Sequence, residues 1–144
     1  MIIHLATDHA GFQHKEAVKA YLESEELEVV DHGALELDER DDYPDYIAPA
    51  AVAVAEDQDS YGIFFGYSGE GEAMVANRIG GVRATVYYGG DNEILILSRE
   101  HNAANVLSIG ANFVSVEEAI DAVKLWLQTP FSNEERHVRR LSKF

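Results

Sequence analysis

The sequence contains no cysteine, no long apolar segment and few basic residues. Without cysteine, the chain has no disulfide framework, no thiolate metal site and no thiol nucleophile. Its longest uncharged apolar stretches have the length of a strand, which excludes an ordinary membrane-spanning helix. The opening stretch, MIIHLATDHAG, lacks the basic start and the long apolar core of a signal peptide. We therefore expect a cytoplasmic protein.

Positive charge is scarce and unevenly distributed. The 144 residues include 26 acidic and 11 basic side chains, for a formal net charge of −15. Such a surface repels nucleic acids and anionic lipids, so neither is an expected partner. Four of the eleven basic residues nevertheless fall within the last nine positions: Arg136, Arg139, Arg140 and Lys143. This cluster is either a solvated helix face or a clamp for a phosphate group, to which paired guanidinium groups are suited.

Apolar periodicity predicts alternating strands and helices over one domain, residues 1–144. The expected strands are 1–7, 27–30, 61–65, 82–87 and 106–109. The expected helices are 11–24, 46–55, 73–79, 91–100, one that starts at a capping box from Ser115 to Glu118, and a last one after a second box from Ser132 to Glu135. Pro49 is tolerable only near the first turn of its helix. The pattern predicts a three-layer, doubly wound, Rossmann-like α/β domain with a five-stranded parallel sheet and a C-terminal helix.

Three polar stretches follow predicted strands, and ligands of such sheets bind at the carboxyl ends of the strands. They are TDHAG at residues 7–11, GYSGEGE at 66–72 and GAN at 110–112. The first contains Asp8 and His9, a pair that serves either as a helix cap or in a site. We expect the three stretches to meet at one edge of the sheet.

The glycine loop at 66–72 combines an anion-binding backbone with two carboxylates, Glu70 and Glu72. It is not a dinucleotide fingerprint, because Met74 occupies the place of the third glycine, and no P-loop lysine follows. One interpretation is that the glutamates complement the dipole at a helix start. The other is that a carboxylate removes a carbon-bound proton while nearby N–H groups stabilise a transient oxyanion. The residues alone favour neither.

The remaining candidates are His101 and Asn102 at the end of a predicted helix, and His137 beside the terminal arginines. A histidine at a helix end often only complements the C-terminal dipole. None of His9, His101 and His137 shows the close spacing of a metal-binding pair, so we expect no metal.

Taken together, these motifs resemble the ribose-5-phosphate isomerase B family, which also contains galactose-6-phosphate isomerase subunits and allose-6-phosphate isomerases. The resemblance is carried in order along the chain by DHAGF, DDYPDY, GYSGEGEAMVANRIGGVRA, SREHNAANVLSIGA and PFSNEERHVRRL. It implies an aldose–ketose isomerase that works through a cis-enediolate without cofactor or metal. It also implies a homodimer or a dimer of dimers, with active sites shared between subunits.

The resemblance implies a role for each candidate residue. Many members of the family carry a catalytic cysteine where this chain has Gly66, whereas a second branch carries a glutamate at the position of Glu72, which would be the base. The backbone from Ser68 through Gly69 and Glu70 to Gly71 would hold the enediolate oxygen. The other implied roles are ring opening by His101, contacts to sugar hydroxyls by Asp8 and Asn102, shaping of the pocket by Tyr43, and phosphate binding by His9, Arg136, Arg140 and the nearby His137.

Three departures from the family pattern concern the substrate. Asn112 stands where an arginine commonly binds phosphate, and the loss of one charge-assisted contact costs about 1.5–3 kcal/mol. Tyr67 replaces a small residue at the loop mouth. Glu70 replaces a neutral residue and is expected to raise the pKa of Glu72 by like-charge repulsion. The alternatives are therefore an isomerase of another pentose or hexose, phosphorylated or not, and a catalytically silent sugar-phosphate-binding subunit.

Overall fold

Five parallel strands form the centre of the molecule in a computed structural model that describes residues 1–144. The strands are β1 (Ile2–Thr7), β2 (Glu28–Asp31), β3 (Ser60–Gly66), β4 (Ala84–Tyr87) and β5 (Val106–Gly110). Their order across the sheet is β2-β1-β3-β5-β4, and every neighbouring pair is parallel. The predicted five-stranded parallel sheet is confirmed, and all the strands end at the same edge, called here the carboxyl edge.

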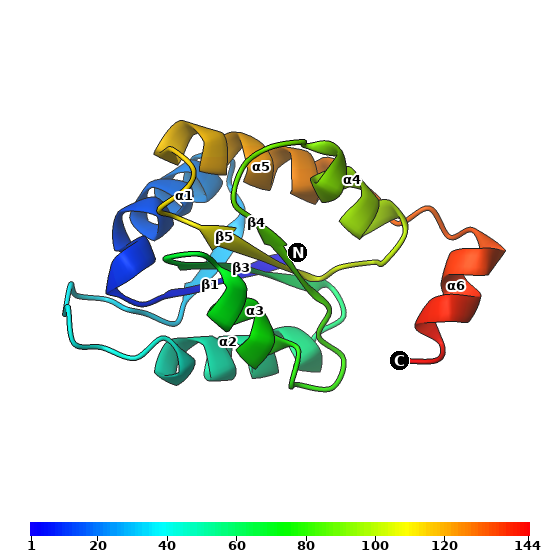
Figure 1. The fold of residues 1–144 in the computed structure, drawn as a ribbon, viewed down its shortest axis with the longest axis horizontal. Helices are drawn as coiled ribbons and strands as arrows, with labels where there is room; N and C mark the ends of the chain where they lie inside the picture. The colour runs from blue at the N-terminus through cyan, green and yellow to red at the C-terminus, as the bar shows by residue number, and fades with distance from the viewer.

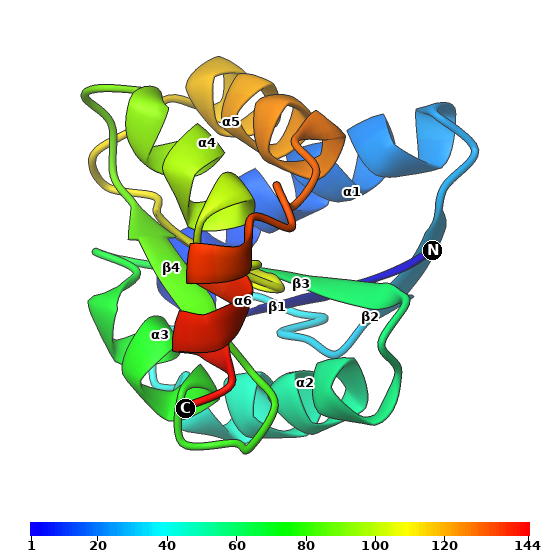
Figure 2. The same ribbon diagram turned by 90° about the vertical axis from the view of Figure 1, so that its right-hand side faces the viewer.

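Helices cover both faces of this sheet (Figure 1). The helices of the chain are α1 (Phe12–Ser24), which follows the short 3-10 helix η1 (His9–Gly11), α2 (Pro44–Glu56), α3 (Glu70–Ala76), α4 (Glu93–Glu100), α5 (Val116–Gln128) and α6 (Glu135–Leu141). Helices α1, α4 and α5 lie on one face, and α2 and α3 lie on the other (Figures 1 and 2). This is the predicted three-layer arrangement.

Each face of the sheet has its own apolar core because side chains alternate along a strand. Ile63 and Phe65 of β3 belong to the larger cluster, which includes Trp126 of α5. Phe64 points the other way and packs with Ile47 of α2 in the smaller cluster. The central strands β1, β3 and β5 are buried almost throughout, which fixes the positions of the loops that follow them.

Two local predictions about proline and capping were wrong. Helix α2 begins at Pro44, so Pro49 lies inside it rather than in the first turn. Burial of Ile47 and Ala50 against the sheet holds the helix although Pro49 lacks an N–H donor. The second capping box is not formed, because the Ser132 hydroxyl donates to the Glu100 carbonyl at 2.7 Å and the helix starts later. The first box, from Ser115 to Glu118, is confirmed with both of its hydrogen bonds.

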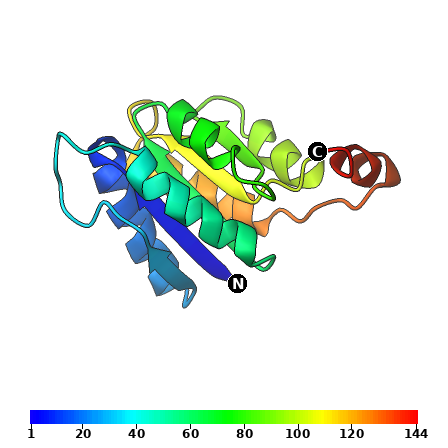
Figure 3. The same ribbon diagram turned by 90° about the horizontal axis from the view of Figure 1, so that it is seen from below.

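The final helix, α6, stands apart from the three layers. In Figures 1 and 3 it extends beyond the edge of the sheet where the strands begin, called here the amino edge. The carboxyl and amino edges are at opposite ends of the molecule, so residues at one edge lie far from residues at the other. No helix of the structure is long and apolar enough to span a bilayer.

Candidate active site

The Glu72 carboxylate occupies the space that a side chain at position 66 would fill. Glu72 lies in the first turn of α3, and Gly66 is the last residue of β3. A Cβ built on Gly66 would overlap the carboxylate of Glu72. The Glu72 side chain therefore reaches back from the helix onto the carboxyl end of the central strand, and the absence of a side chain at position 66 makes this possible.

Burial makes Glu72 an unusual carboxylate. The residue is 4% exposed. The pKa of Glu72 is raised to about 6, mainly because burial removes water from the carboxylate; a hydrogen bond from its own N–H lowers the pKa, and the negative charge of Asp8 adds to the increase. Glu70 is exposed and is not among the causes, so the expectation that Glu70 raises this pKa was wrong. A carboxylate with a pKa near neutrality is suited to accept and return a proton.

The backbone of the glycine loop is held in place by β5. Gly69 adopts a left-handed conformation, with φ of 80°, immediately before α3. The Ser108 hydroxyl donates to the Gly69 carbonyl at 2.6 Å, and Ser108 is fully buried. The N–H groups at the start of a helix have no acceptor within the helix, so they are available to an oxyanion. The Glu70 amide makes only a long contact, 3.3 Å, with the Ser68 hydroxyl.

Asp8 and Tyr43 complete the polar surroundings of Glu72. Asp8 is 7% exposed and caps η1 by accepting a hydrogen bond from the Ala10 N–H at 3.0 Å. Burial raises the pKa of Asp8. The Tyr43 ring packs against Gly71, where an added Cβ would come within 2.7 Å of the Tyr43 hydroxyl. These residues, together with the glycine loop, form one cluster at the carboxyl edge.

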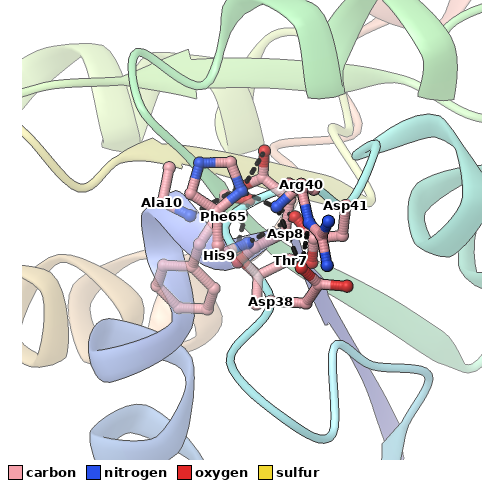
Figure 4. Close-up of polar contacts among 8 residues, drawn as sticks. All are labelled: Thr7, Asp8, His9, Ala10, Asp38, Arg40, Asp41 and Phe65. Atoms are coloured by element: carbon pink, nitrogen blue, oxygen red, sulfur yellow. Dashed lines mark hydrogen bonds and ion pairs between the residues drawn. The ribbon is translucent and has the colours of Figure 1, made fainter.

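His9 is tied to an aspartate of the acidic loop (Figure 4). The Nδ1 atom of its ring lies 2.6 Å from Oδ1 of Asp41, and its backbone N–H donates to the same oxygen at 3.0 Å. The ligand-type atoms of Asp8, His9 and Asp41 lie within 4.8 Å of one another. As they stand, the His9 nitrogen and the Asp41 oxygen are engaged with each other rather than directed at a common point.

A small cavity of about 370 Å³ opens beside His9. Tyr67 and Asn112, two of the departures noted in the sequence, line it together with His9 and His14. No arginine or lysine is among its nine lining residues. Within this cavity the two histidines are therefore the only groups that can carry positive charge.

The other predicted site residues lie at the amino edge. His101 and Asn102 follow the end of α4, which runs back from the carboxyl ends of the strands to their beginnings. The rings of His101 and His137 stack with centroids 4.2 Å apart and an interplanar angle of 17°. Burial lowers the pKa of His137, and the neighbouring His101 lowers it further. Asn102 lines a cavity of about 650 Å³, together with the C-terminal residues Leu141 and Phe144.

The terminal arginines are exposed on α6. Arg136 is paired with Glu134 at 2.8 Å, and Arg140 has no ion-pair partner within the chain. Because α6 lies beyond the amino edge, one copy of the chain places these guanidinium groups at the opposite end of the molecule from Glu72 (Figures 1 and 3). The structure thus brings the predicted site residues together in two separate groups.

Two residues of the carboxyl-edge cluster were not identified from the sequence. Asp41 is one of several carboxylates in the stretch LELDERDDYPDY, and no local pattern distinguishes it from its neighbours. Ser108 lies within an apolar strand, where a single serine gives no indication that its hydroxyl supports the glycine loop.

Comparisons with known proteins identify the family of this arrangement. A family model described as Ribose/Galactose Isomerase matches residues 3–144. Ribose-5-phosphate isomerase B of Mycolicibacterium paratuberculosis is 39% identical over 141 residues, which cover 98% of this chain and 87% of that protein. Ribose-5-phosphate isomerase B of Escherichia coli is 37% identical over 134 residues, or 93% of this chain and 87% of that protein.

The fold is also shared with a solved structure that contains a sugar phosphate. The crystal structure of ribose-5-phosphate isomerase B from Mycoplasma genitalium with bound ribulose-5-phosphate superposes with a TM-score of 0.93 at 34% sequence identity. The alignment covers 99% of this chain and 92% of that one.

Proposed function

The chain belongs to the Ribose/Galactose Isomerase family, a family of intramolecular oxidoreductases, and we propose that it interconverts D-ribose 5-phosphate and D-ribulose 5-phosphate. The observation that carries this proposal is the buried carboxylate of Glu72, with a pKa of about 6, seated over Gly66 beside the glycine loop. Relatives named ribose-5-phosphate isomerase B along nearly the whole chain support the choice of substrate. A cytoplasmic location remains a prediction of the sequence.

In the proposed reaction, Glu72 moves one proton between two carbons of the open-chain sugar. The carboxylate takes the proton from C2 of the aldose, and the C–H electrons form the C1=C2 bond of a cis-enediolate. The negative charge develops on the C1 oxygen, where the N–H groups between Ser68 and Gly71 stabilise it. Glu72 then returns the proton to C1, while the proton of the C2 hydroxyl passes to the C1 oxygen, so that C1 carries the hydroxyl and C2 becomes the ketone. No cofactor is required for this transfer.

Other residues are proposed to prepare and hold the substrate. His101 opens the furanose ring by acid–base catalysis, and Asp8 and Asn102 bind sugar hydroxyls. Tyr43 closes the pocket over the glycine loop. His9, Arg136 and Arg140 bind the phosphate, with His137 stacked on His101.

These roles require a second copy of the chain. Glu72 and Asp8 lie at the carboxyl edge, whereas His101 and the α6 arginines lie at the amino edge of the same copy. We propose that two chains pair so that the amino edge of one covers the carboxyl edge of the other. Such a dimer would contain two equivalent sites, because a two-fold interface uses the same surfaces twice.

The test of the reaction is turnover by the purified chain with a panel of pentoses and hexoses, each with and without phosphate. We expect ribose 5-phosphate to react and E72Q to lose activity by at least about a hundredfold while still binding substrate. E93Q is the control, because Glu93 is an exposed glutamate in the first turn of another helix. Full activity in E72Q would reject the proposed base.

Asn112 and Tyr67 favour a second candidate, an isomerase of a different sugar. Both line the cavity beside His9, and neither brings positive charge to it. The same panel decides between the candidates, because preferential turnover of a hexose phosphate or of an unphosphorylated sugar would replace ribose 5-phosphate as the substrate. Absence of turnover with every sugar would point to the silent subunit of a hetero-oligomer.

A further inference from the structure

Asp41 holds both the backbone and the ring of His9 through a single oxygen. Its Oδ1 atom accepts the His9 N–H at 3.0 Å and lies 2.6 Å from Nδ1 of the ring (Figure 4). A contact this short between an imidazole nitrogen and a carboxylate oxygen is typical of a charge-assisted hydrogen bond. The interaction joins η1, at the end of β1, to the acidic loop that precedes α2.

The surroundings of Asp41 favour a positive charge on His9. The side chain of Asp41 is 6% exposed, and its second oxygen, Oδ2, is buried without a hydrogen-bond partner. The only cationic group within ion-pair distance of it is His9, because no lysine or arginine is paired with this carboxylate. A buried carboxylate without a counter-charge is costly, so Asp41 is stabilised when the imidazole is protonated.

The second nitrogen of the ring is left for a ligand. The His9 side chain is 36% exposed and lines the 370 Å³ cavity, and Nδ1 is occupied by Asp41. In the protonated ring both nitrogens carry a proton, so Nε2–H remains as a donor. Since one chain contributes no arginine or lysine to this cavity, His9 provides positive charge there in addition to the arginines proposed to come from a second chain.

We propose that Asp41 is a positioning residue that keeps His9 oriented and positively charged, so that His9 binds the phosphate of the substrate through Nε2–H. This inference rests on the proposed function for the identity of the anion. Asp41, a residue of the acidic loop, thereby acts on phosphate affinity through His9.

The groups around His9 set the pH range of this effect. The hydrogen bond to Asp41 raises the pKa of His9, burial opposes this increase, and the negative charges of Asp8, Asp41 and Glu39 add to it. His14 of α1 lines the same cavity and is the other titratable cation there. A raised pKa means that the cationic ring persists above the usual histidine value of about 6.5 and is lost as the pH rises further.

The experiment compares D41N with D42N, an exposed neighbour that loses the same charge. In D41N we expect the imidazole of His9, followed by NMR, to titrate at lower pH than in the parent protein. We also expect KM for ribose 5-phosphate to rise about tenfold at pH 8, with kcat little changed. Comparison at each pH is needed because the phosphate of the sugar itself titrates near pH 6. D42N should follow the parent protein in both measurements.

A second variant separates positioning from folding. H9Q retains a neutral donor but cannot be charged, so its KM should be raised and D41N should add nothing to it. If D41N raises KM equally in the H9Q background, or if His9 titrates alike in D41N and D42N, the proposal is wrong. N112R, which puts a permanent cation into the same cavity, should reduce the effect of D41N on KM.

Failure of the proposed function would be recognised separately. The NMR titration needs no substrate, and inorganic phosphate can serve as the probe anion in place of the sugar. If the parent protein turned over no sugar at all, the proposed function would fail, and the shift of the His9 titration in D41N would still test the Asp41–His9 pair.

Discussion

The Glu72 carboxylate, where it lies, leaves no room for a side chain at position 66. The carboxylate fills the volume that any Cβ at position 66 would need. A carboxylate that reaches back from the first turn of α3 in this way is therefore compatible only with glycine at the end of β3. The resemblance to the family implies a catalytic cysteine in place of Gly66 in many members, and the overlap gives a physical reason why such a cysteine and the observed Glu72 carboxylate would not occur together.

The first prediction is that G66A displaces the base without unfolding the protein. The new Cβ must move the Glu72 carboxylate, so kcat/KM should fall by at least about a hundredfold, the usual contribution of a general base. G80A is the matched control, because a Cβ at Gly80 meets no atom within 4 Å. Steady-state kinetics and circular dichroism of both variants provide the test. Retained activity in G66A would show that the observed position of the carboxylate is not the catalytic one.

The second prediction concerns stability, because the buried charge of Glu72 opposes folding. Its pKa rises from 4.5 in a model compound to about 6 in the folded chain, so the folded state binds more protons between these values. Stability then falls as the pH rises from about 4.5 to about 6 and stays lowered above that range, by about 2 kcal/mol.

The E72Q substitution should remove this pH-dependent loss of stability, because glutamine carries no charge. We expect the variant to be more stable than the parent protein at pH 7.5, by up to about 2 kcal/mol, and close to it at pH 4.5. Urea unfolding at the two pH values measures the difference, and E93Q again serves as the control. An equal effect of E72Q on stability at both pH values would contradict the conclusion that burial raises the pKa of Glu72 in the folded chain.

At the scale of the elements, the glycine loop depends on the strand beside it. The Ser108 hydroxyl of β5 bonds the Gly69 carbonyl, and a Cβ on Gly110 would come within 2.6 Å of the Ser68 carbonyl oxygen. The central strand β3 thus supplies the loop, whereas the neighbouring strand β5 holds it. A loop supported on two buried strands keeps its N–H groups in a fixed direction, as stabilisation of an oxyanion requires.

The third prediction is that S108A loosens the loop. Loss of this hydrogen bond should cost about 1 kcal/mol of stability, and the displaced N–H groups should lower kcat roughly tenfold. S60A is the control, since the buried Ser60 hydroxyl also donates to a backbone carbonyl, at 2.8 Å, but at the amino end of β3. If both variants lose stability and neither loses activity, Ser108 has only a structural role.

The helices and strands were predicted correctly where the sequence signal is local. Alternation and apolar runs predicted all five strands, and the box from Ser115 to Glu118 predicted the start of α5, because these signals are local. The predictions that depended on tertiary contacts failed. Ser132 bonds Glu100, a partner 32 positions away, and Pro49 is held in a helix by the sheet beneath it. Neither contact can be inferred from the neighbouring residues.

At the scale of the molecule, sequence motifs identified the candidate residues but not their distribution between two edges. Glu72 and His101 belong to neighbouring motifs, yet the crossover through α4 carries His101 to the amino edge. Asp41 was missed because many similar carboxylates surround it. Its importance appears only when the fold places it against His9.

The last prediction tests whether two chains share each site. E72Q and H101Q should each be inactive alone, because each damages both sites of its own dimer. In a mixed dimer, one site receives both changes and the other receives neither. Random pairing makes half of the dimers mixed, so co-refolding equal amounts should restore about a quarter of the parent activity.

The control for this experiment is a pair of variants that damage the same edge. E72Q and G66A both disable the carboxyl edge, so their mixed dimers have no intact site and should stay inactive. Recovery with E72Q and H101Q but not with E72Q and G66A would establish that Glu72 of one chain works with His101 of another. No recovery in either mixture, with mixed dimers verified by mass, would mean that each chain builds its site alone. In that case α6 and the end of α4 would have to move from the amino edge across the sheet to reach Glu72, and the buried contacts of α4 with α5 oppose such a movement.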